Sequence, residues 1–123
     1  MSQPLAIIFY ERIMPGSQLI NRLQDKNYRV LALYHAAALP ETLQREMPLF
    51  LIADLNAKGD ICGAIKAIKQ NPATSHIPVI AFAPDNAPQQ IEAGKTAGAN
   101  LAVGDSAIAN HLPQLLDQAL QVE

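Results

Sequence analysis

The sequence contains few of the residues that enzymes and metal proteins use at their sites. Its 123 residues include one cysteine, Cys62, and no tryptophan. A disulfide within the chain is therefore impossible, and a reducing compartment is indicated. The three histidines, His35, His76 and His111, lack the spacing of zinc ligands. No G-x-G-x-x-G, G-x-x-x-x-G-K-[ST] or G-x-S-x-G motif occurs, which argues against nucleotide binding and serine hydrolysis. We expect no enzymatic activity.

The charge and hydropathy patterns exclude two further classes of partner. The net charge is −2, with 9 basic and 11 acidic residues, and the basic residues are scattered rather than clustered as nucleic-acid binding requires. No apolar run approaches the roughly 20 residues of a membrane-spanning helix. The length suits one hydrophobic core. We therefore expect a single cytoplasmic domain over residues 1–123 that binds neither nucleic acid nor membranes.

Short apolar segments alternate with helical segments along the whole chain. Strand-like segments occupy residues 5–10, 29–34, 49–53, 77–83 and 101–103. Helical segments follow them at residues 17–23, 40–47, 60–70, 87–97 and 112–120. Five strands that alternate with five helices predict a parallel sheet with helices on both faces, joined by right-handed crossovers. We predict the flavodoxin-like strand order 2-1-3-4-5.

Specific residues mark the expected limits of the helices. Ser17 and Asp60 are expected N-caps, because a short polar side chain can accept a hydrogen bond from the first turn. Gly98 is expected to end the fourth helix in a left-handed conformation, which glycine adopts easily. Pro113 is placed in the first turn of the last helix, where its missing N–H costs least. A helix that began near Ser106 would instead be kinked at this proline.

Asp54 is the most informative residue of the sequence. It ends the apolar run Leu49–Asp54 and is followed by a turn-rich stretch. In open α/β sheets, ligands bind beyond the carboxyl ends of the strands, at the point where the strand order reverses. This rule places Asp54 beside Tyr10 and Glu11, which end the first strand. Alternatively, Asp54 caps a turn or the following helix, as aspartates often do. Position alone does not distinguish the two interpretations.

Several short motifs along the chain recur together in one known family. The run Leu49-Phe50-Leu51-Ile52-Ala53-Asp54 is followed by Gly63 and by Ile77-Pro78-Val79, and Ala97-Gly98-Ala99-Asn100 precedes the last strand. With the length and the order of strands and helices, these motifs resemble the response-regulator receiver domain (CheY-like superfamily) over nearly the whole chain. The resemblance implies a CheY-like fold, two-component (phosphorelay) signalling, and a phosphoacceptor at the position of Asp54.

The resemblance also implies where Mg²⁺ would bind. Receivers hold Mg²⁺ with an acidic pair after the first strand, with the phosphoacceptor, and with a backbone carbonyl two residues beyond it. The acidic pair is matched here by Tyr10 and Glu11, so one carboxylate is missing. Because Mg²⁺ keeps several waters and needs few protein ligands, the resemblance leaves open a Mg²⁺ site of Glu11, Asp54 and the backbone carbonyl of Asn56. No other cofactor is expected.

The positions that stabilise a phosphoryl group in receivers are altered in this sequence. The resemblance matches Ala83 to the family's serine or threonine, Asp105 to its lysine, and Ala102 to its aromatic switch residue. Ala83 has no hydroxyl to donate, and an anion at Asp105 would repel a phosphoryl group instead of stabilising it. Together with Tyr10, these residues form a degenerate switch, which is typical of a pseudo-receiver.

We therefore interpret the chain as a stand-alone, receiver-like signalling domain that acts through protein–protein interaction, with Asp54 as the one candidate phosphoacceptor. The alternative is a Mg²⁺-dependent response regulator that a histidine kinase phosphorylates at Asp54. An unrelated small α/β enzyme is disfavoured, because no nucleophile or acid–base pair is visible. The expected partners are a histidine kinase, a downstream effector or a second copy of the chain. In receivers such partners dock on the fourth helix, the fifth strand and the fifth helix.

Overall fold

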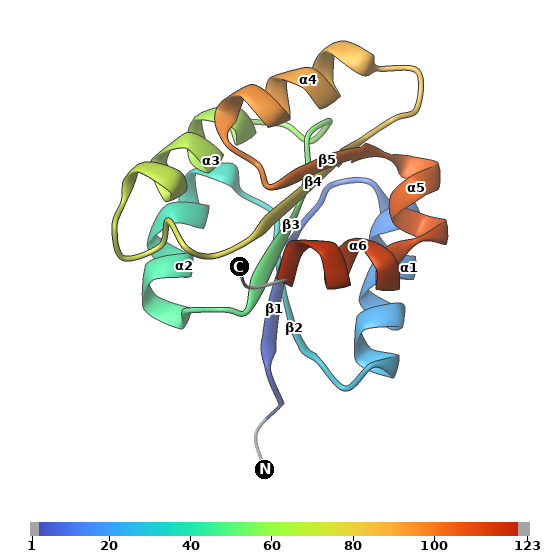
Figure 1. The fold of residues 1–123 in the computed structure, drawn as a ribbon, viewed down its shortest axis with the longest axis horizontal. Helices are drawn as coiled ribbons and strands as arrows, with labels where there is room; N and C mark the ends of the chain where they lie inside the picture. The colour runs from blue at the N-terminus through green and yellow to red at the C-terminus, as the bar shows by residue number, and fades with distance from the viewer. Residues whose placement is uncertain (1–2, 121–123) are drawn as a thin grey trace.

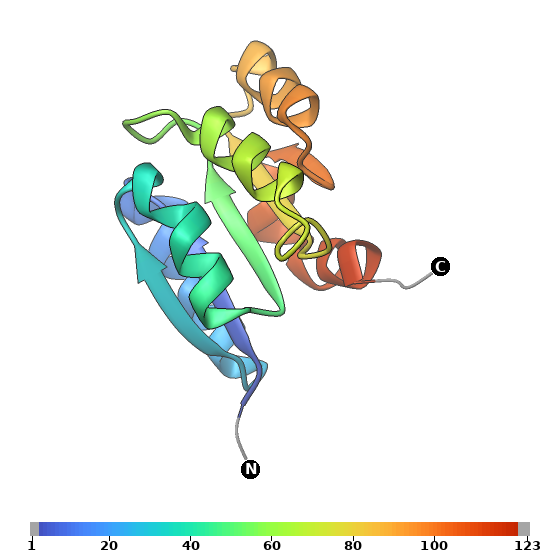
Figure 2. The same cartoon turned by 90° about the vertical axis from the view of Figure 1, so that its left-hand side faces the viewer.

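A five-stranded parallel sheet lies between two layers of helices (Figures 1 and 2). The computed structural model describes residues 3–120. The strands are β1 (Leu5–Phe9), β2 (Arg29–Leu33), β3 (Phe50–Asp54), β4 (Val79–Ala83) and β5 (Leu101–Gly104). Their order in the sheet is β2-β1-β3-β4-β5. The predicted fold class and strand order are therefore confirmed, and β3 is the central strand.

The described chain also contains six α-helices and one short 3₁₀ turn, of which the last two helices follow β5. They are α1 (Ile13–Asp25), the turn η1 (Ala36–Ala38), α2 (Leu39–Glu46), α3 (Ile61–Gln70), α4 (Pro88–Ala97), α5 (Asp105–Asn110) and α6 (Leu112–Leu120). The longest of these, α1, has 13 residues. Within residues 3–120, no helix has the length and apolar character needed to cross a membrane.

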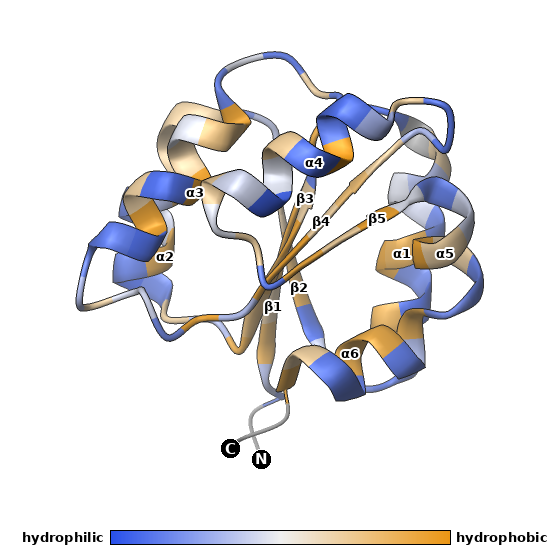
Figure 3. Ribbon diagram, turned by 45° about the horizontal axis from the view of Figure 1, so that its top comes forward, coloured by the Kyte–Doolittle hydropathy of each residue, from blue (hydrophilic) through white to orange (hydrophobic). Residues whose placement is uncertain are grey.

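The two faces of the sheet form two separate hydrophobic cores. Helices α2, α3 and α4 cover one face, and α1, α5 and α6 cover the other (Figure 1). Successive strand side chains point to opposite faces, so that Ile7 contributes to one core and Ile8 to the other. Every residue of β1, β3 and β4 is buried, which explains why these strands are continuous apolar runs. In Figure 3 the hydrophobic colour accordingly follows the strands, and the helices carry most of the hydrophilic colour.

Two of the predicted helix limits are confirmed, and a third is wrong. The Asp60 side chain caps α3 by accepting a hydrogen bond from the backbone N–H of Gly63, with 2.9 Å between N and Oδ1. Gly98 ends α4 with φ of 116°, in the left-handed region. Ser17 is not an N-cap, because it lies inside α1. Pro15 accounts for the earlier start, since its fixed φ suits the first turn of a helix and its missing N–H needs no partner there.

The C-terminal helical region divides into two helices, where the sequence predicted one. Helix α5 ends before His111, which has φ of −126° and ψ of 27°, and α6 begins after it. Pro113 therefore lies in the first turn of α6, as predicted. A single helix through this proline would lose a hydrogen bond and bring its ring against a preceding carbonyl. The additional helix α5 places Asp105 directly after β5, at the sheet edge that also carries Asp54.

Candidate functional site

Asp54 lies at the carboxyl end of the central strand, and none of its side chain is exposed to solvent. The backbone N–H of Asn56 donates a hydrogen bond to Asp54 Oδ1 at 2.9 Å. This contact is the turn-capping role that the sequence left open for Asp54. One backbone hydrogen bond does not compensate a fully buried carboxylate. The buried position therefore requires a cation close to Asp54.

Arg12, in the loop between β1 and α1, supplies that cation. Its Nε donates to Asp54 Oδ2 at 3.2 Å, and its Nη2 donates to Asp54 Oδ1 at 2.9 Å. The other edge of the guanidinium bonds Asp105, with Nη1 at 2.8 Å from Oδ2 and Nη2 at 3.2 Å from Oδ1. The planar group thus bonds all four oxygens of two carboxylates. We call Arg12, Asp54 and Asp105 the arginine clamp.

The arginine clamp is a partly buried charge cluster. The side chains of Arg12 and Asp105 are 25% and 26% exposed, in contrast to the enclosed Asp54. Burial lowers the pKa of the Arg12 guanidinium, but its hydrogen bonds to Asp54 and Asp105 outweigh burial and raise that pKa above its ordinary value. The guanidinium carbon also lies 5.7 Å from the centre of the Phe82 ring, within cation–π range. Arg12 is therefore a permanent positive charge between two acids.

The other residues predicted for a Mg²⁺ site, Glu11 and Asn56, lie in different environments. Glu11 is exposed, and the cationic partner of Asp54 is the next residue, Arg12. Asn56 presents its backbone N–H to the Asp54 carboxylate, and its side-chain Oδ1 accepts a hydrogen bond from Gln90 Nε2 at 3.0 Å. The structure therefore brings Asp54 and Asn56 together through a turn, and Glu11 points to solvent.

The altered switch positions are packing residues in this structure. Ala83 and Ala102 are both buried in the core beneath α2, α3 and α4. The ring of Tyr10 lies edge to face with that of Tyr34, with 5.5 Å between the ring centres. A hydrogen bond to Tyr34, together with burial, raises the pKa of Tyr10. Neither alanine can donate a hydrogen bond from its side chain, and the Tyr10 ring packs against Tyr34.

A second polar contact ties the loop after β4 to the start of α5. The backbone N–H of Ser106 donates to Asp85 Oδ1 at 3.2 Å, and the Ser106 hydroxyl donates to Asp85 Oδ2. These hydrogen bonds lower the pKa of Asp85. The close approach requires Gly104, because a Cβ at this position would collide with Asp85 Oδ1. Helix α5 is thus held at two consecutive residues, Asp105 by Arg12 and Ser106 by Asp85.

Both acids of the clamp were predicted from the sequence as site positions, but Arg12 was not. Asp105 was expected to repel phosphoryl groups, and in the structure Arg12 already pairs with this charge. One signal was present in the sequence. The carboxyl ends of parallel strands meet at one edge of the sheet, so two acids at the ends of β3 and β5 require a counter-ion from a loop at that edge. Arg12 follows β1 in such a loop.

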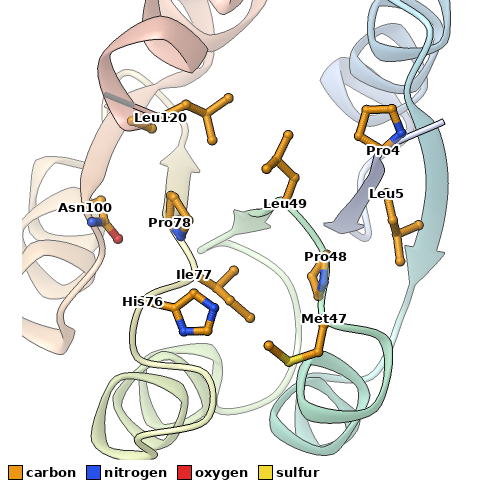
Figure 4. Close-up of a pocket in the computed structure, with 11 residues that line it drawn as sticks. Pro4, Leu5, Met47, Pro48, Leu49, His76, Ile77, Pro78, Asn100 and Leu120 are labelled. Atoms are coloured by element: carbon orange, nitrogen blue, oxygen red, sulfur yellow. The ribbon is translucent and has the colours of Figure 1, made fainter. Parts of the chain in front are cut away.

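A groove of about 750 Å³ lies at the opposite, amino-terminal edge of the sheet (Figure 4). Its lining is mainly apolar and includes Met47 and Leu49, which are 48% and 43% exposed. His76 is the one titratable side chain in the lining. A histidine without an acid or a nucleophile beside it has no partner for catalysis. The chemistry of the described chain is therefore concentrated at the carboxyl edge, at the arginine clamp.

Comparison with known proteins identifies the fold through structure and not through sequence. No protein-family model matches the sequence, and no curated protein matches it. A protein of Chloroflexus aurantiacus J-10-fl, assigned as a response regulator, superposes with a TM-score of 0.87 at 20% identity, covering 97% of this chain and 98% of that chain. A receiver domain of a Pseudomonas aeruginosa PAO1 sensor histidine kinase, with a magnesium ion in its active-site cleft, has a TM-score of 0.84 at 17% identity, with 97% and 98% covered. The chemotaxis response regulator CheY4 of Vibrio cholerae has a TM-score of 0.74 at 16% identity, with 93% and 99% covered.

The residues at the carboxyl edge of this chain do not fit a magnesium ion beside Asp54. Both Asp54 oxygens accept hydrogen bonds from a guanidinium, and a second cation at that position would be repelled by Arg12. Within residues 3–120, no group of three or more histidine, cysteine, aspartate or glutamate side chains is arranged to hold a metal ion. The chain therefore has the CheY-like fold of receiver domains, with an arginine between two acids at the carboxyl edge of its sheet.

Proposed function

We propose that this domain is a receiver-type module of two-component signalling that acts through contacts with other proteins and not through rapid phosphorylation. The observation that carries the proposal is the pairing of both Asp54 oxygens with Arg12. Phosphoryl transfer to a carboxylate needs an oxygen in line with the donor and cations around the transferred group. Because the Asp54 oxygens are buried and bonded, transfer would require the arginine clamp to open.

The altered residues around Asp54 support the same proposal. Ala83 lacks a hydroxyl, and Asp105 is an anion that occupies one edge of the Arg12 guanidinium. When charge develops in the transition state, each missing contact of this kind lowers the reaction rate by a factor on the order of 10²–10³. Asp54 is then retained as a buried structural anion in a degenerate, pseudo-receiver domain.

The alternative function is a Mg²⁺-dependent phosphoacceptor. Two observations favour keeping it as an alternative: Asp54 stands at the carboxyl end of the central strand, and the Arg12 side chain is 25% exposed, so that solvent reaches the guanidinium. In this alternative Arg12 leaves the site, and Glu11, Asp54 and the backbone carbonyl of Asn56 hold the metal ion. A histidine kinase would be the phosphoryl donor.

Intact-protein mass spectrometry separates the two functions. After incubation with acetyl phosphate and MgCl₂, we expect no species heavier by one phosphoryl group, because the Asp54 oxygens are bonded to Arg12. The magnesium-binding receiver domain from Pseudomonas aeruginosa, treated in parallel, serves as the positive control. Rapid gain of a phosphoryl group that Asp54→Asn abolishes would establish the alternative and reject the proposal.

We propose α4, β5 and α6, which is the fifth helix predicted from the sequence, as the face on which a partner docks, whether a kinase, an effector or a second copy of the chain. Strand β5 is an edge strand of the sheet, and Leu101 and Val103 are only partly buried. In α4 the buried residues are the small ones, Gly94 and Ala97, and the larger Ile91 packs against the core but is only partly buried. A Cβ at position 94 would lie 2.8 Å from Leu55 Cδ1, so α4 packs closely but buries little apolar surface. A shallowly anchored helix beside a sheet edge is suited to adapt to a partner.

Hydrogen exchange measured by mass spectrometry tests this docking face. In the free protein, α4 and β5 should exchange faster than α3, whose Ile61, Ile65 and Ile68 are buried. Raising the protein concentration, or adding a histidine kinase, should slow exchange in α4, β5 and α6. Protection limited to α1, or to the loop after Asp54, would show that a different surface is used.

A further inference from the structure

The carboxyl edge of the sheet contains its own cation. We infer that Arg12 takes the position of a divalent metal ion, so that the buried Asp54 and its neighbour Asp105 share a counter-ion without any metal. This inference deepens the proposed function, since it rests on the same site and states why Asp54 is kept there. The inference concerns only which cation lies between the two acids. Binding of a divalent cation at that position can be measured without a phosphodonor or a partner.

The geometry of the clamp carries the inference. Four N–H groups of Arg12 point at four carboxylate oxygens, at distances of 2.8–3.2 Å. The Nε and Nη2 edge faces Asp54, and the Nη1 and Nη2 edge faces Asp105. A rigid fork with two usable edges can bridge two carboxylates, which the point charge of a lysine cannot do. The bridging position between two acids is the position that a divalent cation would otherwise take.

The clamp also joins parts of the chain that are distant in sequence. Arg12 is separated from Asp54 by 42 positions and from Asp105 by 93. It therefore connects the β1–α1 loop with the end of β3 and with the start of α5. The Phe82 ring of β4 lies beneath the guanidinium, so four of the five strands contribute to this edge or flank it. A metal ion is not required to hold the edge together.

Removal of Arg12 creates the condition in which a metal ion would bind. Without the guanidinium, the carboxylates of Asp54 and Asp105 have no counter-ion between them, and Asp54, which is enclosed while Arg12 is in place, would face the space that the guanidinium leaves. Carboxylate oxygens are the ligands that Mg²⁺ and Mn²⁺ take from proteins. The clamp with Arg12 in place therefore excludes divalent cations. The same two acids should accept a divalent cation when a neutral residue replaces Arg12.

Thermal unfolding in MgCl₂ and in NaCl of equal ionic strength tests the inference. For the wild-type protein, 10 mM MgCl₂ should leave the melting temperature unchanged, because no site is free. Arg12→Gln should melt at a lower temperature in NaCl and regain about 5 °C in MgCl₂, as expected for a site with a millimolar dissociation constant. The matched control is Arg12→Gln with Asp105→Asn, which removes one ligand and should lose this gain.

A second measurement keeps the inference testable if Arg12→Gln does not fold. Mn²⁺ broadens NMR signals of nearby nuclei, and in the wild-type protein it should leave the amide signals of Asn56 and Asp105 sharp. Broadening of these signals, or a rise in the wild-type melting temperature specific to MgCl₂, would overturn the inference. The inference would also be overturned if Arg12→Gln folds and MgCl₂ does not raise its melting temperature. If acetyl phosphate labels Asp54 in the wild-type protein, and divalent ions change neither its melting temperature nor its NMR signals, the proposed function fails and this inference stands.

Discussion

Arg12→Met should lower the free energy of unfolding by about 3–5 kcal/mol, a typical cost of removing one partner of a buried ion pair. The reason is the environment of Asp54, whose side chain has no exposed surface and would keep a single hydrogen bond, from the backbone N–H of Asn56. Methionine retains much of the arginine's volume, so the loss reports on the missing charge more than on a cavity. Urea denaturation followed by circular dichroism measures the change.

The complementary variants should behave asymmetrically. Asp54→Asn should cost only about 1–2 kcal/mol, because Arg12 keeps Asp105 and is itself partly exposed. Adding Asp54→Asn to Arg12→Met should recover part of the lost stability, since no buried charge then remains without a partner. Arg12→Lys keeps the charge but cannot bridge both acids, and should fall between the wild-type protein and Arg12→Met. Equal losses for Arg12→Met and Asp54→Asn would contradict the buried-carboxylate explanation.

Phe82→Ala should lower the free energy of unfolding by about 3–5 kcal/mol, as large-to-small changes of buried aromatic residues do. Phe82 is fully buried in the core beneath α1, α5 and α6, and its ring lies 5.7 Å from the Arg12 guanidinium carbon. The change therefore removes core packing and the aromatic surface under the clamp at once. Thermal or urea denaturation gives the stability loss.

Phe50→Ala is the matched control for this prediction. Phe50 is fully buried in the same core, but its ring contacts Tyr28, with 5.2 Å between the ring centres. Its replacement should cost a similar free energy and leave the Arg12 Nε–H signal in the NMR spectrum at its wild-type position. Phe82→Ala should shift that signal or broaden it. An unchanged Arg12 signal in Phe82→Ala would show that the ring does not support the clamp.

The elements that the sequence predicted well are those in which local pattern and burial agree. β1, β3 and β4 are buried at every position. Each is therefore an apolar run, interrupted only by Asp54 at the end of β3, and such runs are typical of buried strands. The cap at Asp60 depends on a residue only three positions away, Gly63. Such short-range contacts leave a recognisable spacing in the sequence. The same reasoning placed Asp54 at the end of the central strand.

The errors of the sequence analysis occur where local patterns compete. The last helix expected at residues 112–120 is α6, but the short α5 before it was not predicted. Ser17 has the residue type of an N-cap, but it lies inside α1, whose regular helical backbone begins at Pro15 after the non-helical Met14. In both regions a proline decides the limit of a helix, and its preferred position in the first turn outweighs the signal of the neighbouring polar residue.

By itself the sequence determined the sheet, its strand order and the edge at which Asp54 stands, because apolar periodicity and strand ends are local properties. Only the tertiary structure decided what Asp54 does at that edge. Its partner Arg12 lies 42 positions away and is shared with Asp105, a further 51 positions beyond Asp54. A long, flexible side chain in a loop can reach several acids or none, and no spacing in the sequence specifies the choice. The fold selects Arg12 by bringing the β1–α1 loop, the end of β3 and the start of α5 to one edge, where a buried carboxylate is stable only with a cation against it.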